Sequence, residues 1–370
     1  MSQSQPTSAP SAPPQAPPPP FGIGDRFPNF KLPDATGLVR DFHAEVTGRP
    51  ALLLLAERLG EGAGATLWSL LGAQAARLAA AGVELFAIGG DLPAALAALA
   101  PPTGIPSLVL RDPDQRLTRL LLAGLPARLV AVDANQRALS VPAVADPLAQ
   151  LEAGLAAIGA WRLGVGEAAP AGLGAPLLVL PRVLPPELCA TLIGLWETQN
   201  QEGRVSAGSN ENFYSADRKK NREHVVTDPA VAQQVLRFVS RRIGPDLAKV
   251  FNYTQAYRFE SFIVLGYQVE RQDFFGRHRD RYLAEHPRRF AMSLNLNDDY
   301  DGGWLRFPEY SSQLYRPPAG GACVFSCSLL HEALPVTRGR RFAMTTFFHA
   351  AEGAQNPAHQ AGAPQARPAR

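Results

Sequence analysis

The first half of the chain alternates apolar runs of strand length with longer segments of helical period. An apolar run at 51–57 is followed by a stripe of large apolar residues, Trp68, Leu71 and Leu78, at the spacing of one helix face. Strands that alternate with helices predict βα units and a mostly parallel sheet. The expected elements lie at 51–57, 66–81, 83–89, 92–100, 107–110, 114–123 and 146–160, and a hairpin-like stretch separates the last two.

The second half of the chain changes to a strand-like period. Proline opens two helices before this change, the first at 185–186 and the second at 228–229, where an aspartate is a good N-cap. We expect the second helix to run to about Ile243. From Arg258 onward, short apolar runs separated by turns predict five or more strands. Many short strands at close spacing are typical of a closed or double-sheet β architecture, here with two helices bracing one side.

Segments of biased composition divide the chain. Residues 1–20 contain eight prolines, and residues 351–370 have a similar bias, so we expect a disordered leader and a disordered tail. Residues 163–177 concentrate Gly, Ala and Pro and predict a linker. The linker separates an N-terminal block, residues 21–162, from a C-terminal block, residues 178–350.

Charge and composition argue against several classes of protein. Lys and Arg number 36 against 33 Asp and Glu in the whole chain, and 22 against 18 within 176–350, so we expect no nucleic-acid partner. No stretch approaches about 18 uninterrupted apolar residues, which predicts no membrane span. The chain begins without a signal-peptide pattern, and three cysteines cannot form a disulfide framework. We therefore expect a cytoplasmic protein.

The N-terminal block carries four segments in a recognisable order: GDRFPNFKLPDATGLVRDF, PALLLLAE, AGVELFAIGGD and IPSLVLRDPDQRL. In this order they resemble the thioredoxin-fold peroxiredoxins, which implies an α/β thioredoxin-like domain. That family's chemistry needs a thiolate in the loop after the first long strand. The corresponding segment here is ERLGEGAGATLW, and no cysteine precedes Cys189. We expect a scaffold or docking domain without a redox cysteine.

The C-terminal block contains a candidate metal site. His278 and Asp280 are two residues apart, so on a strand their side chains point to the same face. His331 ends a later apolar run, where antiparallel strands can bring it to the same place. Two histidines and one carboxylate form the facial triad that holds Fe(II) and leaves positions open. The competing interpretation is a chance His-x-Asp pair and an unrelated core histidine.

The combined wording HRD, GGWLRF and HEALPVTRGRR resembles the prolyl 4-hydroxylase-like branch of the 2-oxoglutarate- and Fe(II)-dependent dioxygenases. The resemblance implies a mainly β double-stranded β-helix, or jelly roll. It makes His278, Asp280 and His331 the iron ligands, with no catalytic residue beyond them. It implies three cofactor-binding residues: Arg341 as the anchor of the 2-oxoglutarate C5 carboxylate, Tyr267 as a hydrogen-bonding partner of the co-substrate, and Asn295 as a pocket-lining residue.

The resemblance also implies a reaction. A dioxygenase of this branch would use Fe(II), 2-oxoglutarate and O2, with ascorbate as a reductant, to hydroxylate a prolyl or other residue in a peptide or protein. Succinate and CO2 would be the co-products. The halogenating relatives lack the carboxylate that Asp280 provides, so hydroxylation is favoured. A free amino acid or small metabolite is equally compatible with the metal site, and the N-terminal block could present a protein partner or only support the oxygenase.

Other features leave alternatives open. The basic run at 217–224 is typical of a solvated loop, but the family resemblance also suggests a mobile lid over the substrate channel within 205–224. Cys323 and Cys327 are best interpreted as strand-core residues, with a thiol pair as the alternative. Two functions remain as alternatives to the dioxygenase: a non-catalytic interaction protein, and a thiol redox protein that would use Cys323 and Cys327.

Overall fold

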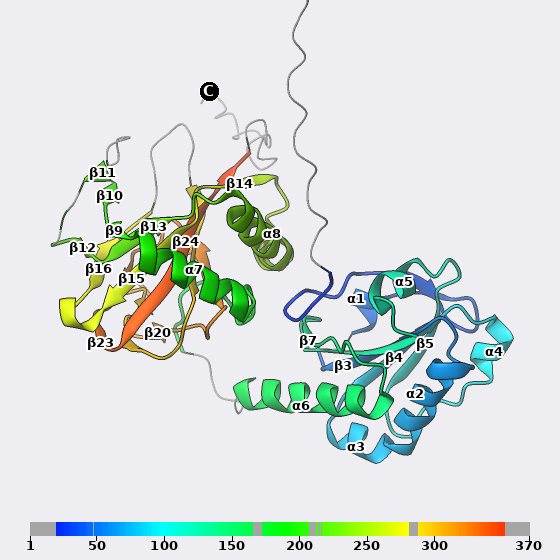
Figure 1. The fold of residues 1–370 in the computed structure, drawn as a ribbon. Helices are drawn as coiled ribbons and strands as arrows, with labels where there is room; N and C mark the ends of the chain where they lie inside the picture. Colours follow the sequence, from blue (N-terminus) through cyan, green and yellow to red (C-terminus); the bar gives the residue numbers. More distant parts are fainter. Residues whose placement is uncertain are drawn as a thin grey trace, which may run out of the picture.

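The computed structural model describes residues 20–46, 48–165, 172–206, 212–213, 215, 217–280 and 288–351. Apart from residues 20 and 351, the predicted leader and tail lie outside these described residues. Figure 1 shows two groups of elements side by side, blue to green for the N-terminal block and green to red for the C-terminal block. No helix in the described part of the chain is long and apolar enough to span a membrane.

The N-terminal block is built on a mixed five-stranded sheet of order β5-β4-β3-β6-β7. Strands β3, β4 and β5 are parallel, as expected from the βα pattern, while β6 and β7 form the antiparallel hairpin. The elements are β1 (Lys31–Pro33), β2 (Val39–Asp41), α1 (Phe42–Glu45), β3 (Ala51–Ala56), α2 (Gly62–Ala73), α3 (Ala75–Ala80), β4 (Glu84–Gly89), α4 (Pro93–Ala97), β5 (Ser107–Arg111), α5 (Arg116–Leu122), β6 (Ala127–Val132), β7 (Ala138–Ser140) and α6 (Pro147–Val165).

Helices cover both faces of this sheet. Leu52 and Leu54 of β3 pack in one apolar cluster with residues of α2, α3 and α6. Leu53 and Leu55 pack on the other face with residues of α1 and α5. Because side chains alternate along a strand, the fully buried run of β3 supplies both cores of a three-layer α/β block.

The segment expected to form one helix at 66–81 forms two helices, α2 and α3. Helix α2 begins earlier than expected, at Gly62, and Gln74 leaves the helical region (φ −101°, ψ 14°) between α2 and α3. The early start depends on Gly64, because a Cβ there would lie 1.9 Å from the carbonyl oxygen of Arg58. Helix α6 also exceeds its prediction and ends at Val165, inside the expected linker.

The C-terminal block contains two larger antiparallel sheets. One has the order β8-β21-β17-β24-β15-β13-β9, with β14 paired to β24, and the other has the order β12-β16-β22-β19-β20. Its elements are β8 (Leu177–Leu180), α7 (Pro186–Gln199), β9 (Gln201–Glu202), β10 (Val205–Ser206), β11 (Asn212–Phe213), β12 (Lys219–Lys220), β13 (Arg222–Val225), α8 (Pro229–Phe251), β14 (Tyr257–Phe259), β15 (Ile263–Gln268), the 3₁₀ helix η1 (Val269–Arg271), β16 (Phe274–His278), β17 (Arg288–Asn295), β18 (Asp301–Gly302), β19 (Leu305–Arg306), β20 (Leu314–Tyr315), β21 (Ala322–Ser326), β22 (His331–Ala333), β23 (Val336–Arg338) and β24 (Arg340–Ala350).

The two sheets share one apolar core, and helices brace the other face of the eight-stranded sheet. Tyr267 and Ala291 of the larger sheet pack in one cluster with Leu305 and Ala333 of the smaller sheet. Helices α7 and α8 pack against the outer face in a second cluster, as expected. Helix α8 runs to Phe251 rather than to about residue 243, although it contains a proline. The extension places more apolar side chains against the sheet.

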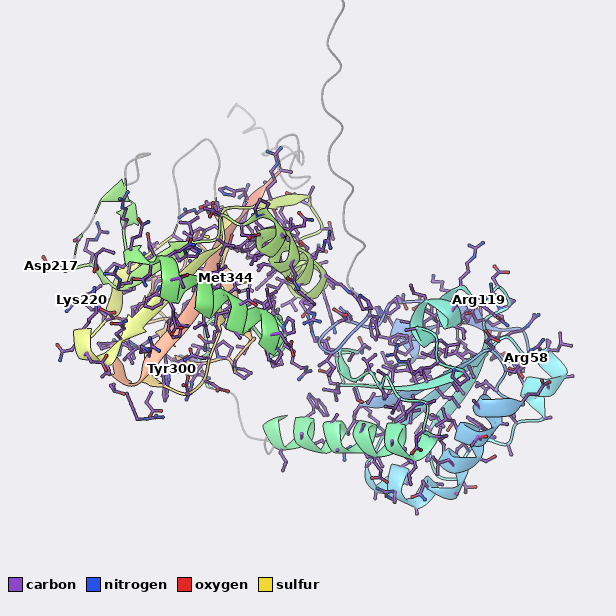
Figure 2. All side chains as sticks on the ribbon, viewed as in Figure 1. Arg58, Arg119, Asp217, Lys220, Tyr300 and Met344 are labelled. Carbon is purple, nitrogen blue, oxygen red and sulfur yellow. The ribbon has the colours of Figure 1, made fainter. Side chains whose placement is uncertain are left out.

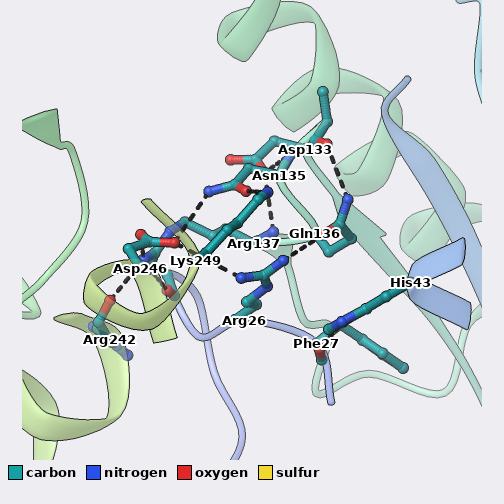
Figure 3. A network of polar contacts seen from close by, with 12 residues as sticks. Arg26, Phe27, His43, Asp133, Asn135, Gln136, Arg137, Arg242, Asp246 and Lys249 are labelled. Atoms are coloured by element: carbon teal, nitrogen blue, oxygen red, sulfur yellow. Dashed lines mark hydrogen bonds and ion pairs between the residues drawn. The ribbon is translucent and has the colours of Figure 1, made fainter. Parts of the chain in front are cut away.

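The two blocks meet through buried ion pairs at α8 (Figure 3). Asp246 of α8 pairs with Arg137, and their side chains are only 2% and 4% exposed. Asp25 of the N-terminal block accepts from Arg242 of α8 at 2.9 Å. Charges buried in this way are costly unless each keeps its partner, so these pairs fix how the blocks dock.

Candidate metal centre

Two imidazoles and one carboxylate converge inside the C-terminal block. His278 ends β16, His331 begins β22, and the two residues are direct partners across the antiparallel pair. The backbone N–H of Asp280 donates to the carbonyl of Cys327 at 3.1 Å, which fixes the carboxylate beside them. Each of the three side chains offers one ligand atom, and these atoms lie within 4.8 Å of one another. The structure thus brings the three predicted residues together.

A β-bulge and a stacked ring orient His278. Phe275 pairs with Ala333 and His278 with His331, so β16 has one residue more than β22 between these two pairs. Bulges of this kind re-aim side chains beside functional sites. The Phe275 ring stacks on the imidazole of His278, with ring centroids 3.6 Å apart. Of the two phenylalanines at 274 and 275, the second therefore lies at the site.

Backbone carbonyls set the tautomer of both imidazoles. Nδ1 of His278 lies 2.8 Å from the carbonyl oxygen of Gly276, and Nδ1 of His331 lies 3.1 Å from that of Leu329. A carbonyl only accepts, so each Nδ1 carries the proton and each Nε2 keeps its lone pair. The two Nε2 atoms lie 3.4 and 3.3 Å from the carboxylate oxygens of Asp280. Their lone pairs face the same point as the carboxylate.

The protonation states suit a divalent cation. Burial lowers the pKa of His331 to about 4, so its imidazole is neutral at pH 7. Burial acts to raise the pKa of Asp280, but the neighbouring His331 and His278 outweigh it and the pKa is lowered. Metal ligation needs neutral imidazole and ionised carboxylate. Two nitrogens and one oxygen in this arrangement fit the Fe(II) that the family resemblance implies.

A buried arginine lies in the same cavity without a carboxylate partner among the described residues. Arg341 on β24 is 3% exposed and is the direct cross-strand partner of Tyr267 on β15. Its Nη2 donates to Ser293 Oγ at 3.2 Å and to Asn295 Oδ1 at 3.1 Å. Neutral acceptors leave the charge uncompensated, so the guanidinium is suited to an anionic ligand that enters the cavity.

The other two predicted cofactor residues differ in position. Tyr267 lines the cavity, with its ring centroid 5.3 Å from Cζ of Arg341. Burial raises the pKa of Tyr267 to about 12, so its hydroxyl stays protonated and can donate. Asn295 is not among the described residues that line the cavity, contrary to expectation. It lies behind Arg341, because its amide donates to the carbonyl of Pro317 at 2.7 Å while its oxygen accepts from the guanidinium.

The triad, Tyr267 and Arg341 line one cavity of about 760 Å³ between the two sheets. Among the residues of its wall that sequence reasoning missed is the pair of Lys219 and Glu223. Nζ of Lys219 donates to Oε2 of Glu223 at 2.8 Å, and both side chains are buried. The pair adds one cation and one carboxylate, each with its partner, to the wall of the cavity.

The expectation of a solvated loop at 217–224 is therefore wrong for much of the segment. Lys219, Asn221 and Glu223 are 6%, 1% and 7% exposed, and they alternate at the period of a strand. Because the alternating residues are polar, hydrophobicity could not reveal this period. The lid hypothesis for 205–224 stays a prediction, since residues 207–211, 214 and 216 lie outside the described part of the chain.

The cysteines do not form a reactive site. Cys323 and Cys327 are fully buried. Burial raises the pKa of Cys323 to about 12 and raises the pKa of Cys327 as well. A thiol that keeps its proton is a poor nucleophile, which agrees with the expectation of strand-core cysteines.

A carboxylate binds the backbone of the loop after β3, where the resemblance to the peroxiredoxins would place a thiolate. Asp91 is 2% exposed and accepts from the backbone N–H groups of Leu59 at 2.7 Å and Gly60 at 3.2 Å. Arg58 of the same loop is labelled at the outer side of this block in Figure 2. The loop amides are therefore occupied by the protein's own side chain.

Comparison with known proteins identifies the family. A PKHD-type hydroxylase of Cupriavidus metallidurans is 30% identical over 186 residues, which cover 47% of this chain and 77% of that protein. The chain belongs to the PKHD-type hydroxylase family. Membership confirms the resemblance to the dioxygenases and the expectation that the protein is an enzyme, a hydroxylase. No family model matches the chain.

Other proteins are similar to parts of this PKHD-type hydroxylase. Human procollagen-lysine,2-oxoglutarate 5-dioxygenase 2 is 31% identical over 138 residues, which cover 34% of this chain and 18% of that protein. A prolyl-4-hydroxylase structure from Pseudomonas putida aligns with a TM-score of 0.38 at 20% identity, over 48% of this chain and 94% of the other. A peroxidoxin structure from Mycobacterium tuberculosis aligns with a TM-score of 0.33 at 18% identity, over 38% of this chain and 97% of the other.

Proposed function

We propose that this hydroxylase uses Fe(II), 2-oxoglutarate and O2 to hydroxylate a prolyl or other residue in a peptide or protein, with succinate and CO2 as co-products. The observation that carries the proposal is the convergence of His278, Asp280 and His331 in one cavity with the uncompensated guanidinium of Arg341. The three residues would hold Fe(II), which supplies a Lewis-acid centre with open positions. The similarity to a procollagen-lysine dioxygenase supports a peptide substrate.

The remaining residues of the cavity bind and orient the co-substrate in this proposal. The planar fork of Arg341 matches the distal carboxylate of 2-oxoglutarate, and Asn295 and Ser293 hold the fork in place. The hydroxyl of Tyr267 donates a hydrogen bond to the same dicarboxylate. Phe275 holds the plane of the His278 imidazole and excludes water from that side.

Replacing Arg341 with lysine should weaken co-substrate binding. The ammonium keeps the charge but loses the bidentate fork, so the KM for 2-oxoglutarate should rise about 10- to 100-fold. Initial rates of 2-oxoglutarate decarboxylation measure it. Arg340→Lys is the matched control, because Arg340 is exposed and pairs with Glu197 at 3.1 Å. Equal KM values for the two variants would contradict the assigned role.

Removing the metal should separate this proposal from thiol chemistry. A chelator should abolish turnover, and added Fe(II) should restore it. The variant with both Cys323→Ala and Cys327→Ala should keep metal-dependent turnover, because neither thiol has a role in the proposal. Loss of activity in the cysteine variant together with resistance to the chelator would favour the thiol redox function.

We also propose that the two blocks are separate domains and that the N-terminal block supports the oxygenase. The ion pairs of Asp25 with Arg242 and of Asp133 with Arg182 join the blocks, at 2.9 and 2.7 Å. An N-terminal block that had only a tethered recruiting role would not need such contacts.

A further inference from the structure

The wall of the cavity carries more positive than negative charge. Its lining residues include six cationic side chains against three carboxylates, and a cleft lined mainly by one sign of charge attracts the opposite sign. The cationic residues are Arg204, Arg218, Lys219, Arg279, Arg288 and Arg341, and the acidic ones are Glu223, Glu260 and Asp280.

Most of these cations have an assigned partner. Lys219 pairs with Glu223 at 2.8 Å. Arg288 pairs with Glu260 at 2.5 Å, and Arg279 donates to Glu309 at 2.9 Å. In the proposed function Arg341 binds the co-substrate, so only Arg204 and Arg218 remain to be explained.

Arg204 and Arg218 are exposed, and no carboxylate among the described residues pairs with either. Their backbones are nevertheless tied to the cavity wall. The carbonyl of Arg218 accepts from the N–H of Gly276 at 2.8 Å, two residues before His278. The carbonyl of Arg204 accepts from Nζ of the buried Lys219 at 3.0 Å. Both guanidinium groups therefore start from fixed points at the same wall, and neither has a carboxylate partner within the described part of the chain.

Figure 2 labels Asp217 and Lys220, the sequence neighbours of this wall, at the side of the C-terminal block that faces away from the N-terminal block. The N-terminal block, which docks at α8, does not cover this side. A long substrate such as a polypeptide can therefore approach the two arginines.

We propose that Arg204 and Arg218 form an anion-binding subsite and that the substrate is an acidic peptide segment, with Glu or Asp beside the residue to be hydroxylated. The inference rests on the proposed function and names its substrate class. Arginine forks bind carboxylates through charge-assisted hydrogen bonds. A phosphodiester chain would need a longer cationic track, and the charge balance of 22 to 18 in residues 176–350 provides little.

Peptide binding to the intact protein tests the subsite without turnover. Fluorescent peptides with a central Pro-Lys pair, flanked by Glu, Gln or Lys, are titrated anaerobically into protein loaded with Fe(II) and 2-oxoglutarate. We expect the Glu-flanked peptide to bind at least about tenfold tighter than the Gln-flanked one at low salt, and the Lys-flanked one to bind weakest. The variant with Arg204→Gln and Arg218→Gln should lose this preference, and Arg204→Lys with Arg218→Lys should keep most of it.

A charge-matched control uses Arg116→Gln with Arg119→Gln. Both residues lie on α5 of the N-terminal block, where Figure 2 labels Arg119, while Asp217 and Lys220 are labelled on the C-terminal block. This control should keep the wild-type preference for acidic peptide. Melting curves of all variants verify that they fold.

Three results would overturn the inference. They are equal binding of Glu- and Gln-flanked peptides, an unchanged preference in the Arg204→Gln, Arg218→Gln variant, and tighter binding of a single-stranded oligonucleotide than of the acidic peptide. The proposed function is tested separately by 2-oxoglutarate decarboxylation in the wild-type protein. Absence of decarboxylation alongside the expected peptide preference would count against the proposed function and not against the subsite.

Discussion

Replacement of Asp280 by alanine is expected to lower turnover by at least about a thousandfold while the protein stays folded. The variant lacks the only anionic ligand of the three. A thousandfold lower turnover corresponds to a loss of about 4 kcal/mol of transition-state stabilisation by the metal. The fold should survive because the neighbouring His331 is neutral and the change leaves no buried cation unpaired. Succinate formation and bound iron measure the effect.

The matched control for this variant is Asp301→Ala. Asp301 lies in the same block, but its side chain is 48% exposed and pairs with Arg338 at the surface. Surface pairs contribute about 0–1 kcal/mol, so its turnover should match that of the wild type. An Asp280→Ala variant that keeps a tenth of the activity would exclude Asp280 as a ligand.

Replacement of Asp246 by alanine should destabilise the protein by about 3 to 5 kcal/mol. The carboxylate is buried between the blocks, where it pairs with Arg137 and lies 3.9 Å from Nη1 of Arg26. Without it, the buried Arg137 and the partly buried Arg26 lose this carboxylate and repel each other. Urea unfolding followed by circular dichroism gives the change in the free energy of unfolding.

The surface pair of Arg77 and Glu152 provides the comparison. Both side chains are 49% exposed, and they join at 2.7 Å. Glu152→Ala should therefore change the free energy of unfolding by no more than about 1 kcal/mol. A change of similar size for Asp246→Ala would mean that the ion pairs at α8 do not hold the blocks together.

The residues of the candidate site could be predicted from the sequence where their position depends on spacing along one strand. The i, i+2 spacing of His278 and Asp280 places both on one strand face, and a later strand needs only one antiparallel pairing to bring in His331. The position of Arg341 followed from the family resemblance. The alternation of strands and helices in the N-terminal block likewise predicted that β3, β4 and β5 are parallel, because a helix between two strands returns the chain in the same direction.

Features that depend on distant partners were not accessible from sequence. Lys219 is buried because Glu223 and the carbonyl of Arg204 receive its ammonium, and neither contact leaves a hydrophobic pattern. The pairing of Arg137 with Asp246 joins residues 109 positions apart. Asn295 was expected to line the cavity, but its hydrogen bonds to Arg341 and Pro317 hold it behind the guanidinium.

The most direct test of the metal centre is an anaerobic titration of the purified protein with Fe(II) and then 2-oxoglutarate, followed by visible absorption. We expect a weak charge-transfer band when both are bound, and no band for His278→Ala. Absence of the band in the wild-type protein, with no bound iron, would contradict the assignment of His278, Asp280 and His331 as ligands.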